Sequence, residues 1–440
     1  MKSDCRRMSG CISPFAVWII GMVTALCSLI IAAPTAAETL LSGQSTTIFR
    51  MGKGADERTL NPLYEYLRLK GESEGEKGAF SLNMGGWGRA DLRERTSDKK
   101  TNADLQYGNV NYQGKNDNLW LTAGRQFVAE GVATERLDGL YLRGDLAAGF
   151  GAAAFVGSPV LTEPNATGGD VLYGGRLMHS MPEYCTVGVS ALRTDDNGDR
   201  IREEMGIDLW FHPLSQIDVT GRSSYNSITS GWMEHAYAVT VTPLEKLRIY
   251  ADLSKINYND YFYQVTTNVF SLAKLIDPKE DVFALGGGVE ITLLENLRLT
   301  ADYKGYDYKL AGHADYYGGK ASLLLDDSFM AGASIHRMEG ESAKLRYNEY
   351  RVYGSKRLGK ANLTLDFFDV KYDSAVDGIT NTYSATAAVA YDLTERVQVA
   401  ADVSYSRSTD FNHLLSGLVK LTWSFDKKIG TEGGAKSEKK

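Results

Sequence analysis

The densest set of charged side chains in the sequence lies between Gly124 and Gly139, where acidic and basic residues follow one another closely. The candidate functional residues there are Arg125, Glu130, Glu135, Arg136 and Asp138, with Arg143 just beyond. Charges of both signs that meet inside a narrow passage form a crossed-charge constriction, which selects what passes by charge and size. The alternative is a solvated rim, in which ordinary ion pairs contribute little to stability. The residue types alone leave both open.

The elements that position these side chains are β-strands, because a two-residue alternation runs through most of the chain. The last example has aliphatic and aromatic side chains on one face and Lys420, Thr422 and Ser424 on the other. Such a strand suits a barrel with lipid outside, water inside and a terminal ring at the headgroups. The sequence therefore predicts a closing strand at the carboxyl end, whose outward residues are Gly417, Val419, Leu421, Trp423 and Phe425.

Short polar turns separate the alternating runs, and longer charged connections lie between these turns. Nine turns are predicted, near Lys115, Ala147, Pro182, Pro213, Pro243, Leu294, Asp327, Leu358 and Thr394. With an opening strand over Phe80–Arg93 and the closing strand, they give about 20 strands, within a range of 16 to 20. The predicted fold is all-β: a closed antiparallel transmembrane β-barrel over residues 80–425, with short periplasmic turns and longer extracellular loops. A soluble β-sandwich or propeller, the alternative, needs fewer long strands and more apolar inner faces.

A recurring pattern after the short turns places four aspartates opposite the aliphatic face. If the aliphatics face lipid, these aspartates line the lumen at similar heights: Asp252, Asp302, Asp366 and Asp402. They are either solvated polar positions or an acidic belt that favours cations.

The amino terminus has the pattern of a signal peptide, residues 1–37, with basic residues, an apolar run and a small-residue cleavage site. An uncleaved membrane anchor is the alternative. Cleavage removes three basic residues and one acidic residue, so the formal charge changes from −7 to −9. Cys185 is then the single cysteine, and no internal disulfide is expected. Residues 38–79 alternate poorly and are predicted to be a periplasmic leader, with Pro62–Leu69 ordered against the barrel mouth; residues 426–440 are predicted to be a disordered tail.

Other motifs carry weaker signals. The connection Tyr258–Asp281 is aromatic and apolar, and we expect it to fold into the barrel or to cap it, because exposed apolar loops aggregate. Arg193–Glu204 partly resembles a calcium loop, but a cation at its first ligand position favours an ordinary loop. The histidines lie far apart, and the chain has no haem-attachment motif. We therefore expect no metal site, no cofactor and no enzyme activity.

The alternation, the turns, the Gly124-Arg-Gln segment and the closing strand together resemble a Gram-negative porin-type barrel. This resemblance covers about residues 79–425 and implies passive diffusion of ions or small hydrophilic solutes through an outer-membrane channel. It also implies outer-membrane lipid, the barrel assembly machinery and further copies of the chain as partners, and no nucleic acid.

Two short segments, Leu63–Leu69 and Gly85–Leu92, are similar to porin-like barrels of metal-reducing bacteria. Those barrels house multihaem c-type cytochromes in trans-outer-membrane electron conduits. This second resemblance implies an insulating sleeve, with the redox chemistry carried by partner proteins. A channel and a cytochrome sleeve therefore remain as the two function classes.

Overall fold

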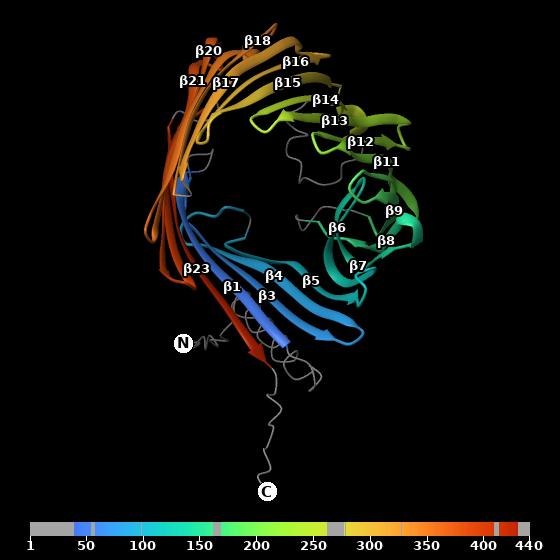
Figure 1. Ribbon diagram of the computed structural model, residues 1–440. Coiled ribbons are helices and arrows are strands. Elements are labelled where there is room, and N and C mark those ends of the chain that lie inside the picture. Colours follow the sequence, from blue (N-terminus) through green and yellow to red (C-terminus); the bar gives the residue numbers. More distant parts are fainter. Residues whose placement is uncertain are drawn as a thin grey trace, which may run out of the picture.

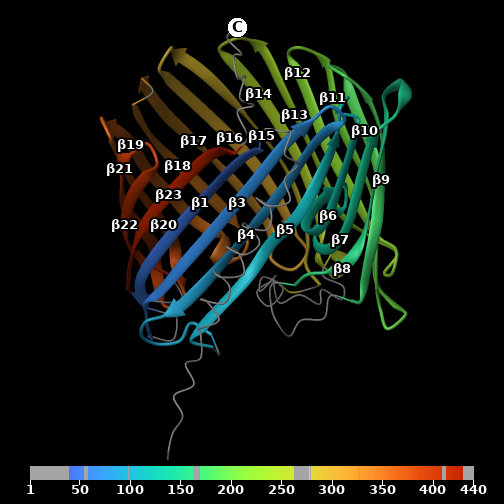
Figure 2. The same ribbon diagram turned by 90° about the horizontal axis from the view of Figure 1, so that it is seen from below.

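The computed structural model describes residues 39–53, 58–97, 99–161, 169–261, 277, 279–326, 328–408 and 413–429. In these residues the chain forms one antiparallel sheet whose 22 long strands close into a barrel. Figure 1 looks along the barrel and shows the strands as a ring, and Figure 2 shows them tilted across the wall. None of the helices in this part of the chain has the length and apolar character that crossing a membrane requires.

The strands follow one another around the ring in chain order. The first half comprises β1 (Thr39–Lys53), β3 (Pro62–Gly75), β4 (Gly78–Asp91), β5 (Thr101–Gly114), β6 (Leu119–Glu130), β7 (Ala133–Asp145), β8 (Phe150–Pro159), β9 (Val171–Met181), β10 (Cys185–Asp196), β11 (Asp199–Leu214) and β12 (Ile217–Asn226). The second half comprises β13 (Gly231–Leu244), β14 (Leu247–Asn257), β15 (Asp281–Leu294), β16 (Leu297–Tyr308), β17 (Gly312–Asp326), β18 (Phe329–Gly340), β19 (Arg346–Leu358), β20 (Ala361–Val376), β21 (Ile379–Thr394), β22 (Val397–Arg407) and β23 (Leu414–Ile429). Short elements join them: β2 (Thr59–Leu60), which pairs with β1, the four-residue helix α2 (Tyr258–Tyr261) and two turns of 3-10 helix (Ala147–Gly149 and Ala343–Leu345).

The barrel closes where β23 pairs with β1, which in turn pairs with β3. Thr39 lies opposite both Ile429 and Ser73, so both ends of the described wall lie at one rim. We call this the turn rim and the opposite end the loop rim. The closed antiparallel barrel predicted from the sequence is confirmed.

All nine predicted turns join consecutive strands at the turn rim. A tenth, Gly75–Gly78 between β3 and β4, was missed. Several connections at the loop rim are also tight. Asn197–Gly198 and Asp377–Gly378 have positive φ at both residues, as a two-residue hairpin turn that matches strand twist requires. The first of them occupies the Arg193–Glu204 segment, which is therefore an ordinary hairpin turn.

The predicted leader is wrong, because residues 39–53 and 62–75 are strands of the wall. Adding these two strands to the predicted 20 accounts for the observed count. The predicted tail is also too long at its start, since β23 continues to Ile429. The predicted signal peptide, residues 1–37, and the tail beyond Ile429 lie outside the described residues.

The two faces of the wall differ as the alternation predicted. Side chains of one parity are exposed aliphatics and aromatics on the outside, among them Val419, Leu421 and Trp423 of the closing strand. The other parity places charged and polar groups inside, such as the Arg351–Asp366 ion pair. Lipid outside and water inside is the arrangement that such a wall requires.

Candidate functional site: an inward-folded hairpin

The β6–β7 hairpin bends away from the barrel wall about halfway along β6. In the described residues the β5–β6 ladder ends at the pair Gly108–Arg125, and the β7–β8 ladder begins only at Leu137–Pro159. Between these points the two strands pair with each other up to Glu130–Ala133. Figure 1 shows the teal strands β6 and β7 parting from β5 and curling towards the green strands β8 and β9. We call residues 126–136 the hairpin tip.

The tip docks on the inner face of β10 and β11. The backbone N–H of Val132 donates to Ser190 Oγ at 3.0 Å. Gly206 provides the space for this contact, because a Cβ there would lie 2.2 Å from Val132 Cγ1. A glycine where two chain segments approach closely is the usual solution to this steric problem.

An apolar cluster lies between the hairpin and the strands β8 to β10. Its members are buried almost completely: Val128, Ala133, Leu137, Phe155, Leu172 and Leu192. They come from five strands, β6 to β10, so the wall curls around a small core of its own. Such a core fixes the tip in one position, because burying each large apolar side chain contributes about 1.5–3 kcal/mol.

The charged residues predicted from the sequence meet on two sides of this hairpin. At its base, Arg125 donates two hydrogen bonds of 2.8 Å to Asp138. Asp104 of β5 lies 3.6 Å from Arg125 and 2.9 Å from Arg136. Arg136 is buried and also donates to the carbonyl oxygens of Val160 (3.3 Å) and Leu161 (2.9 Å). These groups fill the gap that opens where β5 and β6 separate.

The other side of the hairpin faces β9 and β11. Glu130 accepts a hydrogen bond of 2.6 Å from the Tyr141 hydroxyl and lies 3.6 Å from Arg176, which also pairs with Asp208. Glu135 forms an ion pair of 2.6 Å with Arg202 of β11.

Arg202 also pairs with Glu204 at 2.6 Å. Partly buried ion pairs fix the relative position of their two side chains better than exposed ion pairs do. The tip is thus tied to the wall by charge as well as by its core.

Sequence reasoning found the hairpin's charges and missed most of their partners. Arg143, the sixth predicted residue, forms no ion pair with either cluster in the described part of the chain; it lies 3.9 Å from Asp145, over the Trp120 ring at 5.4 Å, and lines the same cavity as Tyr141. Asp104, Arg176, Asp208 and Arg202 come from strands that the sequence does not link to the hairpin. The sequence feature that could have identified them is a charged residue at a strand position that faces the lumen.

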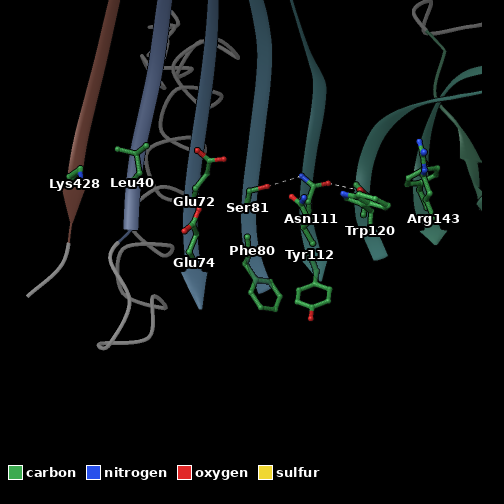
Figure 3. A pocket seen from close by; sticks show the side chains of 14 residues that line it. Leu40, Glu72, Glu74, Phe80, Ser81, Asn111, Tyr112, Trp120, Arg143 and Lys428 are labelled. Carbon is green, nitrogen blue, oxygen red and sulfur yellow. Dashed lines mark hydrogen bonds between the residues drawn. The ribbon is translucent and has the colours of Figure 1, made fainter. Parts of the chain in front are cut away.

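Between the hairpin and the turn rim, the inner wall of β3–β7 contains a cavity of about 800 Å³, which β1 and β23 also line through Leu40 and Lys428. Figure 3 shows Ser81, Asn111, Trp120 and Arg143 around it, with Glu72 and Glu74 on the neighbouring strand β3. A second cavity of about 290 Å³ lies directly under the tip and shares Asn111, Thr122 and Tyr141 with the first.

The four aspartates of the predicted belt face the lumen, and three of them have partners there. Asp252 pairs with Lys304, Asp302 lies 3.3 Å from His336, and Asp366 accepts two hydrogen bonds from Arg351. No partner is recorded for Asp402 among the described residues. Pairing reduces the net negative charge that the belt presents, so its selectivity stays a prediction.

Only the start and end of the Tyr258–Asp281 connection are described. Its first turn, α2, is anchored where Asn226 Nδ2 donates to the Asp260 carbonyl oxygen at 2.8 Å. Burial raises the pKa of Tyr261 in this helix. Residues 262–276 lie outside the described residues, so the expected infolding or capping stays a prediction. Among the residues that are described, no three potential metal ligands come together.

No protein-family model matches the sequence, and comparison with curated proteins gives no match either. Among solved structures, the chain is similar to a mutant of the ferric enterobactin receptor PfeA of Pseudomonas aeruginosa, with 10% identity and a TM-score of 0.54. The match covers 88% of this chain and 80% of that receptor.

Similarity to OccAB4 of Acinetobacter baumannii and OccK3 (OpdO) of P. aeruginosa is weaker. Both have a TM-score of 0.42, with 8% and 12% identity; they cover 90% and 89% of this chain and 99% and 96% of their own. At these identities the comparisons establish the fold, a closed β-barrel.

Proposed function

We propose that the chain is an outer-membrane channel through which ions or small hydrophilic solutes diffuse passively, with the β6–β7 hairpin tip as its narrow zone. The observation that carries the proposal is a closed wall with aliphatics outside, charges inside and one hairpin folded into the interior. A hairpin held by its own core and by ion pairs keeps a fixed aperture, which a passive filter needs. Export through a cleaved signal peptide and insertion by the barrel assembly machinery belong to the same proposal.

Single-channel recording in planar bilayers tests the channel and its narrow zone together. The double variant Glu135→Ala/Ser190→Ala removes two polar anchors of the tip, so its conductance should be larger and noisier than that of the unchanged barrel. The matched control is Arg351→Ala/Asp366→Ala, which removes an ion pair on the opposite wall and should leave the noise unchanged. A purified, folded barrel without conductance would exclude the channel.

The alternative is a sleeve that houses a multihaem c-type cytochrome. The diameter of the barrel favours this sleeve. Barrels of 22 strands enclose a lumen that is normally plugged, and the described residues contain no separate plug domain. The hairpin tip takes up part of the lumen, which favours small solutes over a bulky guest. Affinity purification from native membranes distinguishes the two. Stoichiometric haem protein favours the sleeve, and a haem-free conducting barrel favours the channel.

A further inference from the structure

The two cavities on the inner wall, lined mainly by β3–β7, form one crevice. The larger, of about 800 Å³, and the smaller, of about 290 Å³, share Asn111, Thr122 and Tyr141. Their combined size is that of a site for a small organic molecule. The crevice runs from the turn rim to the underside of the hairpin tip, so a solute that crosses the barrel along this wall passes through it.

The floor of the crevice is a ladder of neutral amides and hydroxyls. Asn111 Nδ2 donates to Ser81 Oγ at 3.2 Å and to Asn109 Oδ1 at 3.1 Å. Thr122 donates its hydroxyl to Asn111 Oδ1 at 2.6 Å, and Asn83 Nδ2 lies 3.4 Å from Asn109 Oδ1. Figure 3 shows Ser81 and Asn111 joined in this way on neighbouring strands. Each amide has both donors and acceptors, so the ladder can exchange its internal hydrogen bonds for bonds to a hydroxylated solute.

An aromatic wall accompanies the ladder. Trp120 lines the crevice beside Thr122, with the Arg143 guanidinium over its ring, and Tyr141 lies at the junction of the two cavities. Trp and Tyr offer a large apolar face together with a polar group. A flat apolar face next to amides matches a ring that carries C–H groups on its faces and hydroxyls at its edge.

We propose that this crevice binds neutral saccharides during their passage through the barrel. The inference rests on the proposed channel and names its solute class. A charged solute would lose hydration against the neutral floor without gaining a counter-charge there. The charges that line the crevice beside this floor have both signs, Glu72 and Glu74 with Lys428 and Arg143, and therefore give no strong preference for either ion.

Binding is tested on the full-length purified barrel by titrating a disaccharide while following tryptophan fluorescence. Saturable quenching is expected, and it should be lost in Trp120→Phe. Asn111→Leu removes the central amide and should weaken binding about tenfold, the effect of one to two lost hydrogen bonds. Thr122→Val is the second variant, should Asn111→Leu fail to fold. The matched control is Thr386→Val, which breaks a hydrogen-bonded hydroxyl pair with Ser404 on the inner face of β21 and should not change binding.

Passage is tested by swelling of proteoliposomes in glucose, gluconate and glucosamine, which have similar size and different charge. Glucose should enter fastest, and Asn111→Leu should slow glucose alone. Equal rates for the three solutes, or equal effects of Asn111→Leu and Thr386→Val on binding, would overturn the saccharide site while leaving the channel intact. Absence of swelling with every solute, together with saturable quenching, would instead remove the channel and keep the site.

Discussion

At the residue scale, a single glycine allows the barrel to close. Gly43 of β1 lies beneath the Phe425 ring of β23, and a Cβ at this position would be 2.4 Å from Phe425 Cζ and 2.9 Å from Leu69 Cδ2. Phe425 in turn packs beside Trp423, with ring centroids 5.2 Å apart. The Phe425 ring therefore covers the seam between the first and last strands, in the closing strand that the sequence predicted.

Replacing Gly43 by valine should destabilise the seam. The added side chain overlaps the Phe425 ring, and overpacking of this kind costs about 1–3 kcal/mol. Urea unfolding in detergent, followed by the loss of the heat-modifiable band, measures the effect. Gly71→Val is the matched control on β3, because no atom lies within 4 Å of a Cβ there. Equal unfolding midpoints for the two variants would contradict the packing of Phe425 on Gly43.

At the scale of elements, the position of the hairpin tip depends on its small core. Leu137 is 0% exposed, and truncating it to alanine should cost about 2–5 kcal/mol of docking energy. The tip should then open often enough for trypsin to cut the folded barrel at Arg136. Leu365→Ala serves as control, because Leu365 is 63% exposed on the outer face of β20. Protection from trypsin in both variants would show that the ion pairs alone hold the tip.

The sequence predicted the wall better than it predicted the hairpin. Outward aliphatics such as Val419 and Leu421 repeat around most of the barrel, and that repetition predicted the strands and nine turns. The first two long strands escaped because polar or small residues interrupt their outward faces: Gly43, Ser45 and Thr47 in the middle of β1, and Glu65 between Leu63 and Leu67 in β3. Hydrogen bonds of 2.5 and 2.6 Å from the Ser45 and Thr47 hydroxyls stabilise the Glu65 carboxylate there.

The inward bend was not predictable for another reason. The partners of residues 126–136 lie far along the chain. Val132 and Ser190 are separated by 58 residues, and Glu135 and Arg202 by 67. A periodicity describes which side chains share a face, and it carries no information about which distant strand that face meets.

At the scale of the whole molecule, β1 is a structural part of the barrel. Deleting residues 39–53 should prevent closure, because β3 and β23 would each keep an unpaired edge. The measurement is the yield of heat-modifiable, protease-resistant barrel in the outer membrane. A normal yield would restore the interpretation of this segment as a leader.

The charge of the lumen should set ion preference if the chain conducts. Changing Asp252, Asp302, Asp366 and Asp402 to asparagine removes four negative charges and leaves Lys304 and Arg351 without their counter-charges. The reversal potential in a salt gradient should therefore move towards anion preference. Asp307→Asn is the control, because Asp307 lies near the loop rim on the outward parity of β16. An unchanged reversal potential would identify the four aspartates as solvated positions without a selective role.

The seam between β1 and β23 also determines when the molecule can fold. It joins Gln44 to Ser424, which are 380 residues apart, so almost the whole polypeptide must be made before the ring can close. Contacts of such long sequence separation form slowly, because loop-closure entropy is lost before they contribute. Until then the backbone N–H and C=O groups along one edge of β1 are unpaired, and they can pair with other chains and cause aggregation. We therefore expect the unclosed chain to need a factor that shields its first strand until its last strand is available.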